Sequence, residues 1–147
     1  MSSYDAKIIG AVNTIHFTKQ KLIGHNTDHI GFRKSLYPLL KRKRKALILG
    51  DGGAAKAIKY ALNTLGIEHK TVSRKSSFDY SDITSNDIEY YNIIINTTPL
   101  GSLPYINETP NIPYQSINSS HLLYDLNYNP VETKFLSYGK NRNIQKI

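Results

Sequence analysis

The sequence predicts an α/β fold in which a mostly parallel sheet is flanked by helices. Four short strand-like runs follow one another, at residues 46–50, 69–73, 92–96 and 122–126. The first two are joined by a glycine turn and an amphipathic helical stripe, which is the pattern of a βαβ unit with parallel strands. The first 24 residues do not fit this alternation and are interpreted as the remnant of a second domain.

Composition limits the class of protein. The chain has 147 residues, 39% of them hydrophobic, which is enough for a folded core and excludes wholesale disorder. It contains no cysteine, so neither a disulfide framework nor a zinc–thiolate site is expected. No apolar run approaches the roughly 20 residues that a membrane-spanning helix needs, and the first residues lack the pattern of a signal peptide. We therefore expect a cytoplasmic protein with no membrane partner.

The formal net charge is +8, and much of it lies in the run Lys41-Arg42-Lys43-Arg44-Lys45. Cations directly after a helix suit the negative end of its dipole, so the run is interpreted as a solvated turn. Binding of nucleic acid is the alternative, but no aromatic interleaving or nucleic-acid motif accompanies the run. We expect no nucleic-acid partner.

The N-terminal part predicts a helix end, a hairpin and a second helix. Residues 4–10 end a helix at Gly10, and residues 11–17 and 22–24 form the two arms of the hairpin. The following helix extends to about Leu40. Three polar residues can cap its start: Asn26, Thr27 and Asp28. The structural interpretation of Asp28 is therefore an N-cap residue.

The stretch at residues 46–66 is the strongest functional signal. A buried strand is followed by Gly50-Asp51-Gly52-Gly53-Ala54-Ala55 and then by a helix that ends near Gly66. In the dinucleotide-binding fingerprint the first glycine permits a tight turn and the second lets the backbone approach a pyrophosphate. The N-terminus of the helix then faces the phosphates. A glycine-rich turn that binds nothing is the alternative.

The second strand, at residues 69–73, ends in Ser73-Arg74-Lys75. An NAD-binding domain usually has an acidic residue here for the ribose 2′-hydroxyl, whereas two cations can bind a 2′-phosphate. The pattern favours NADP over NAD; surface cations without a ligand are the alternative.

The rest of the chain supplies two more strands and their loops. Residues 76–90 are acidic, but their spacing matches no metal-ligand motif, so we expect a solvated loop with a short helix and no metal. Thr97 and Thr98 follow the strand at 92–96, at the carboxyl edge where ligands of open α/β sheets lie. A short helix at 114–117, a helix at 132–139 and a fifth strand within 143–147 complete the prediction.

Several stretches together resemble shikimate dehydrogenase, in the order in which that family has them. They are Gly10-Ala11-Val12-Asn13-Thr14, Gly24-His25-Asn26-Thr27-Asp28-His29-Ile30-Gly31, the glycine turn, Ser73-Arg74, Asn96-Thr97-Thr98-Pro99-Leu100-Gly101 and Tyr124-Asp125-Leu126-Asn127-Tyr128-Asn129-Pro130. The resemblance implies a Rossmann-like fold and reversible transfer of hydride between NADPH and 3-dehydroshikimate. A quinate/shikimate dehydrogenase or a non-catalytic dinucleotide-binding module are the alternatives.

The resemblance also implies roles for single residues. Asp28 matches the aspartate of a catalytic Lys–Asp pair and contacts substrate; Asn13 and Tyr128 match further substrate-binding residues. The positions around the cofactor are Gly50, Asp51, Gly52, Gly53, Ala54, Ser73, Arg74, Lys75, Thr97, Thr98 and Leu126.

The departures from the family shape the remaining expectations. The family's catalytic lysine and its closing helices match nothing in these 147 residues, so we expect a fragment that binds cofactor but turns over little substrate. His29 and Asp51 stand where the family commonly has glycine and alanine. The predicted divisions are 1–26 for the end of the substrate domain, 27–45 for a linker helix and 46–147 for the NADP-binding domain. Exposed apolar surface makes self-association, such as a homodimer, an expectation.

Overall fold

The computed structural model describes residues 1–40, 44–139 and 145–147, and it divides into two compact units. The first, here called the hairpin unit, contains the described residues of Met1–Lys43 and Gly52–Ile67. The second, here called the sheet unit, contains those of Arg44–Asp51 and Glu68–Ile147. The predicted domain boundaries after residues 26 and 45 follow a family pattern rather than compactness, and they stay predictions.

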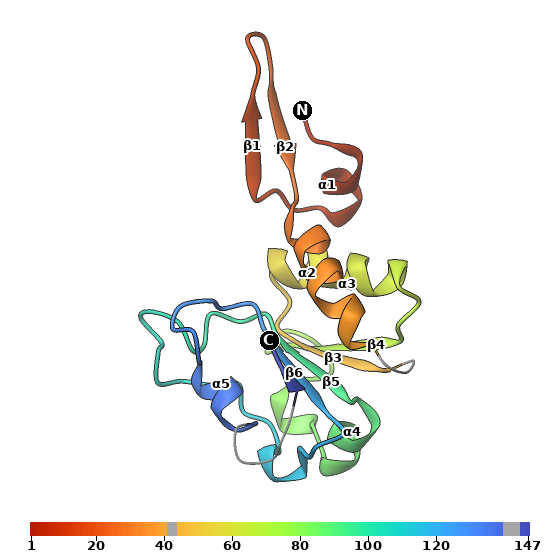
Figure 1. Ribbon diagram of the computed structural model, residues 1–147, viewed down its shortest axis with the longest axis vertical. Coiled ribbons are helices and arrows are strands. Elements are labelled where there is room, and N and C mark those ends of the chain that lie inside the picture. The colour runs from red at the N-terminus through yellow and green to blue at the C-terminus, as the bar shows by residue number, and fades with distance from the viewer. Residues whose placement is uncertain (41–43, 140–144) are drawn as a thin grey trace. The chain divides into compact units, whose positions relative to one another are not determined.

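The hairpin unit begins with a helix, α1 (Tyr4–Ile9), which ends at Gly10 in the left-handed conformation with φ 69°. Strands β1 (Thr14–Phe17) and β2 (Leu22–His25) then pair antiparallel, as Figure 1 shows. The hairpin is confirmed, but its first strand begins at Thr14 rather than at residue 11. The three residues before it are drawn into other contacts: the Asn13 N–H donates to His25 O, and Ala11 O accepts from Asn26 Nδ2.

Two helices complete the hairpin unit, α2 (Asp28–Leu36) and α3 (Gly53–Thr64), and they pack against each other. The prediction that one helix extends to Leu40 was wrong, because α2 gives way to a 3₁₀ turn, η1 (Tyr37–Leu39). Pro38 lies in that turn and has no N–H to continue the α-helical ladder. Of the three candidate caps, Thr27 is the N-cap, without a side-chain cap bond; the structural interpretation of Asp28 as N-cap was wrong, because Asp28 is the first helical residue.

The sheet unit is built on five parallel strands in the order β4-β3-β5-β6-β7. Figure 1 labels β3, β4, β5 and β6 near one another. Their bounds are β3 (Ala46–Leu49), β4 (His69–Val72), β5 (Ile93–Asn96), β6 (Leu122–Asp125) and β7 (Gln145–Lys146). The predicted parallel sheet is therefore confirmed, including its fifth strand; residues 143 and 144 of that prediction lie outside the described residues.

Short helical elements connect these strands: η2 (Tyr80–Asp82), α4 (Ser85–Tyr90), η3 (Tyr114–Ser116) and α5 (Lys134–Ser137). The last helix is shorter than the predicted span of 132–139. Its start is fixed by Thr133, whose hydroxyl accepts from the Leu136 N–H as an N-cap.

The core of the sheet unit explains why its central strands β3 and β5 appear in the sequence as apolar runs, whereas the partly buried edge strand β4 does not. Residues on one face, such as Leu47, Leu49 and Ile94, belong to a buried cluster with Phe135 of α5. Residues on the opposite face, such as Ile48, are equally inaccessible. Parallel strands buried on both faces need apolar side chains at every position rather than at alternate ones. Within the described residues, no helix combines the length and apolar character required to cross a bilayer.

Candidate functional site

The strand order places a topological switch point between β3 and β5. The chain moves from β3 to β4 on one side and then returns to β5 on the other. Leu49 and Asn96, which end these two strands, are register partners. Ligands of open α/β sheets bind outside the carboxyl ends of the strands at such a point. The glycine turn after β3 and the two threonines after β5 begin here.

The first residue of the glycine turn, Gly50, has a conformation and surroundings that only glycine fits. Its φ is +112°, and a Cβ built on it would lie 2.6 Å from Thr97 Oγ1 and 3.1 Å from Thr98 Cγ2. Thr97 cannot simply turn away, because its hydroxyl and its N–H both donate to Leu49 O, at 2.8 and 2.9 Å. The loop after β5 is thus fastened directly onto the end of β3.

The second half of the glycine turn, from Gly52 onward, belongs to the hairpin unit and forms the N-terminus of α3. Gly52 is the N-cap, with extended backbone and no side-chain cap bond. A Cβ on Gly52 would meet nothing within 4 Å, and one on Gly53 would only touch Ala11 Cβ at 3.5 Å. An exposed backbone that begins a twelve-residue helix offers free N–H donors and the positive end of a dipole, which suits a phosphate. Ala54 lies in the same first turn.

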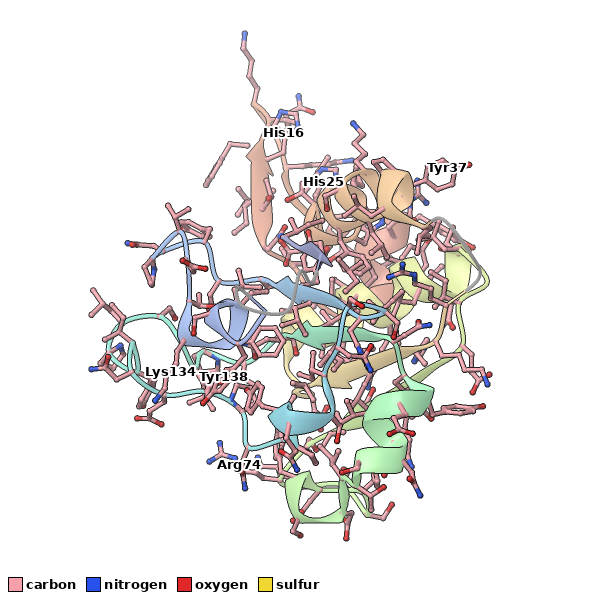
Figure 2. All side chains as sticks on the ribbon, turned by 60° about the horizontal axis from the view of Figure 1, so that its bottom comes forward. His16, His25, Tyr37, Arg74, Lys134 and Tyr138 are labelled. Atoms are coloured by element: carbon pink, nitrogen blue, oxygen red, sulfur yellow. The ribbon has the colours of Figure 1, made fainter. Side chains whose placement is uncertain are left out.

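The residues after β4 form a hydrogen-bonded turn with two exposed cations. Ser73 is buried, and its N–H and carbonyl group both bond to the Ser76 hydroxyl. Arg74 and Lys75 are exposed, and Figure 2 shows Arg74 extending away from the ribbon. The predicted cations are therefore presented to solvent by a turn of fixed backbone.

A buried polar network behind the carboxyl edge was missed by the sequence analysis. The Asp125 carboxylate accepts four hydrogen bonds: from Asn96 Nδ2 (3.1 Å), Asn127 N (3.0 Å), Asn127 Nδ2 (3.0 Å) and Thr133 Oγ1 (2.6 Å). Burial raises the pKa of Asp125 from its ordinary value, although these hydrogen bonds act in the opposite direction. The signal was present in the polar residues that end β5 and β6, but their pairing depends on the strand order.

The same network holds the Thr97–Thr98 loop in place. Asn96 Oδ1 accepts from the Thr98 N–H at 3.0 Å and from its hydroxyl at 2.7 Å. Asn127 Nδ2 donates to Thr98 O at 3.0 Å. Leu126 N donates to Asn96 O at 3.1 Å, which aligns the loop after β6 with the loop after β5. Tyr128, in contrast, is 90% exposed.

Two of the predicted substrate-side residues, Asn13 and Asp28, lie in the hairpin unit, and their segments meet. Asn13 Oδ1 accepts from the Thr27 N–H at 3.0 Å and from the Thr14 and Thr27 hydroxyls at 3.0 and 3.3 Å. Because a backbone N–H can only be met by the oxygen, this bond fixes the orientation of the Asn13 amide. Its Nδ2 donates to no acceptor among the described residues. Asp28, the next residue after Thr27, is partly buried at the start of α2.

His29, which stands where the family commonly has glycine, occupies a buried position next to Asp28 in the chain. His29 is 4% exposed, and its ring packs edge-on against Tyr60 with centroids 5.1 Å apart. Neither ring nitrogen has a hydrogen-bond partner among the described residues. Its Nε2 lies 3.9 Å from Asp5 Oδ2, and Tyr60 donates to the other oxygen of that carboxylate at 2.8 Å. The histidine thus acts as a packing residue where three helices meet.

The acidic stretch and the basic run show structural uses. Asp79 caps η2, and Asp87 completes a capping box with Thr84 at the start of α4. No group of three metal-ligating side chains occurs in the described parts of the chain. Residues 41–43 of the basic run lie outside the described residues. Lys45 lies 3.6 Å from Glu68 and above the ring of Tyr90 at 3.5 Å.

The sheet order, the glycine turn at its switch point and the flanking helices define a Rossmann-like α/β protein. No protein-family model matches the chain. It is 38% identical to a shikimate dehydrogenase (NADP(+)) of Carboxydothermus hydrogenoformans over 97% of its length, and 42% identical to that of Clostridium beijerinckii over 96%. It spans only 58% and 56% of these two relatives. Over nearly its whole length, the chain is therefore similar to rather more than half of a shikimate dehydrogenase.

Solved structures show the same similarity. A shikimate dehydrogenase from Aquifex aeolicus matches 99% of this chain with a TM-score of 0.83 at 31% identity, and the match covers 57% of that chain. A shikimate 5-dehydrogenase from Thermus thermophilus, solved in complex with NADP(H) and shikimate, matches with a TM-score of 0.83 at 28% identity; the match covers 99% of this chain and 59% of that one. A quinate dehydrogenase from Corynebacterium glutamicum, at 24% identity, shares the fold.

Proposed function

We propose that this chain is the cofactor-binding part, with adjoining substrate-side residues, of an NADP-dependent shikimate dehydrogenase. This oxidoreductase reversibly reduces 3-dehydroshikimate to shikimate in aromatic amino-acid biosynthesis, and the bound cofactor supplies the hydride. The observation that carries the proposal is the glycine turn at the switch point of a parallel sheet, in a chain 38–42% identical to enzymes of that name. A cytoplasmic location and a homodimer stay predictions from the sequence.

The residues present fit a dinucleotide. The open backbone at Gly52 and the uncapped start of α3 suit the pyrophosphate, since no side chain stands between it and the N–H donors. Gly50 follows β3, and Thr97 and Thr98 follow β5, so these residues lie at the carboxyl ends of the two strands that flank the switch point. Arg74 and Lys75 suit a 2′-phosphate, Arg74 through a planar fork of donors and Lys75 as a point charge.

The substrate-side roles are proposed from the family resemblance, and the contacts of Asn13 support one of them. The Asn13 amide is locked by Thr27 so that its Nδ2 is free to donate to a substrate hydroxyl. Asp28 is proposed to accept a hydrogen bond from a substrate hydroxyl and to help move the proton that accompanies hydride transfer. Tyr128, exposed on the loop after β6, is proposed to donate a hydrogen bond from its phenolic hydroxyl group to the substrate carboxylate.

The experiment that tests the cofactor site is a fluorescence titration of the chain with NADPH and, separately, with NADH. Arg74→Ala is expected to weaken NADPH binding by about 1–3 kcal/mol, which is typical of a charged group that loses its partner, and to leave NADH nearly unchanged. Lys34→Ala, which removes an exposed cation of α2, is the control for a change in net charge alone. Equal losses for both nucleotides would contradict the 2′-phosphate assignment, and no binding of either would refute the cofactor site.

A further inference from the structure

A carboxylate from the glycine turn lies at the end of the neighbouring strand. Asp51 directly follows Gly50, and its Oδ2 accepts a hydrogen bond from Ser73 Oγ at 3.4 Å. Ser73 is the residue after β4 and is only 7% exposed. Asp51 itself is exposed, and the serine that it contacts directly precedes Arg74 and Lys75.

The hydrogen-bond direction at Ser73 is determined by the backbone. The Lys75 N–H donates to Ser73 Oγ at 3.4 Å, which uses one of the lone pairs of the hydroxyl. The hydroxyl proton is then left for Asp51, and the chain of bonds runs from Lys75 N–H through Ser73 to the Asp51 carboxylate. Two residues that are 22 positions apart are thereby held together at one end of the sheet.

This place determines which dinucleotide a Rossmann-like domain prefers. The adenosine ribose lies at the ends of the first two strands, and an acidic residue that follows the second strand accepts a hydrogen bond from the 2′-hydroxyl. Here the second strand, β4, ends in a serine and two cations, which suit a 2′-phosphate. Asp51 brings the missing acid to the same place from the first strand.

We propose that Asp51 sets the balance between NADH and NADPH in this chain, an inference that rests on the proposed cofactor site. Its carboxylate accepts a hydrogen bond from the 2′-hydroxyl of NADH and repels the 2′-phosphate of NADPH. Arg74 and Lys75 act in the opposite sense. The preference of the chain for NADPH is therefore smaller than the two cations alone would produce, and NADH is a second ligand of the same site.

The size of the effect follows from exposure. Asp51, Arg74 and Lys75 all face solvent, where interactions between charges are weak and are screened by salt. We expect changes of about three- to tenfold in each dissociation constant, the range for one hydrogen bond or one exposed charge pair. The repulsion of NADPH falls as salt is raised, whereas the hydrogen bond to NADH is less sensitive.

The test is a titration of the wild-type chain, Asp51→Ala and Asp51→Asn with NADPH and NADH, at low and at moderate salt. Asp51→Ala is expected to lower the dissociation constant of NADPH by about fivefold and to raise that of NADH by about the same factor. Asp51→Asn removes the charge but keeps an oxygen acceptor, so it gains affinity for NADPH and loses less for NADH. Glu89→Ala, on exposed α4 surface, gives the same change in net charge away from the glycine turn.

Each outcome bears on the inference. Opposite shifts for the two nucleotides support it. An unchanged ratio of the two dissociation constants, or the same shift with Glu89→Ala, overturns the role of Asp51 and leaves the cofactor site standing. Binding of neither nucleotide to any folded variant overturns the cofactor site and this inference together.

Discussion

Replacement of Gly50 by alanine tests how tightly the end of β3 and the loop after β5 are joined. Two independent costs are expected. The backbone has φ +112°, which a residue with a Cβ rarely adopts, and the added methyl group would lie 2.6 Å from Thr97 Oγ1. Rotation of Thr97 away from the methyl group would break its hydrogen bond to Leu49 O. The structure therefore offers no inexpensive way to accommodate the change.

The magnitude can be assembled from these two costs. A strained backbone conformation costs about 1–3 kcal/mol, and an added methyl group in a filled space costs a similar amount, so the free energy of unfolding should fall by about 2–5 kcal/mol. Gly52→Ala is the matched control, two residues along the same turn. Its φ of −78° is allowed for alanine and its Cβ would meet no described atom within 4 Å. Its unfolding free energy should change by less than about 1 kcal/mol.

Urea unfolding followed by circular dichroism and tyrosine fluorescence provides the assay, since the chain has 11 tyrosines and no tryptophan. A loss below about 1 kcal/mol for Gly50→Ala, or equal losses for both variants, would refute the reasoning. The two variants should also separate stability from binding. Gly52→Ala is expected to fold normally and yet to weaken NADPH, because its methyl group enters the space that the pyrophosphate would approach.

Three further predictions concern stability. Burial raises the pKa of Asp125 in the folded state, so the folded state binds this proton more tightly than the unfolded state does. The protonated carboxyl group therefore contributes fully to stability at pH values below its unfolded pKa. This contribution is lost as the pH rises through the folded pKa. Asp125→Asn should therefore remove a decline in stability above about pH 4, and parallel pH profiles of thermal unfolding would contradict this. Thr84→Ala, which removes the N-cap of α4, should cost about 1 kcal/mol in urea unfolding, whereas a neutral result would argue against the capping box. Phe135→Ala empties a fully buried site and should cost about 3–5 kcal/mol; a cost near that of an exposed residue would show that the cluster around α5 is misplaced.

Much of the fold and of the candidate site could be predicted from local sequence patterns. The apolar runs predicted β3 and β5, because strands buried on both faces need apolar side chains at consecutive positions. The turn after β3 was predicted from its glycines, and Gly50 has the positive φ that explains one of them. Ends of elements were less well predicted: Pro38 changed the end of α2, and Thr133 determined the start of α5.

Other features needed the folded chain. The Asn13 amide is oriented by Thr27, 14 positions away, and no pattern in either segment indicates the contact. The carboxylate of Asp125 is satisfied by Asn96, 29 positions away, which requires β5 and β6 to be neighbours. Sequence periodicity does not reveal such contacts, since it indicates whether a side chain is exposed but not which residue it contacts.

The sequence by itself therefore determined the α/β class, the positions of the strands, the glycine turn and the two cations after β4. Each depends on a local requirement, such as burial of consecutive residues or a backbone angle that needs glycine. Only the tertiary structure decided the strand order β4-β3-β5-β6-β7, and with it the switch point and the contact between Asp51 and Ser73. Several orders of parallel strands satisfy the same apolar pattern, and packing between residues far apart in the chain selects one of them.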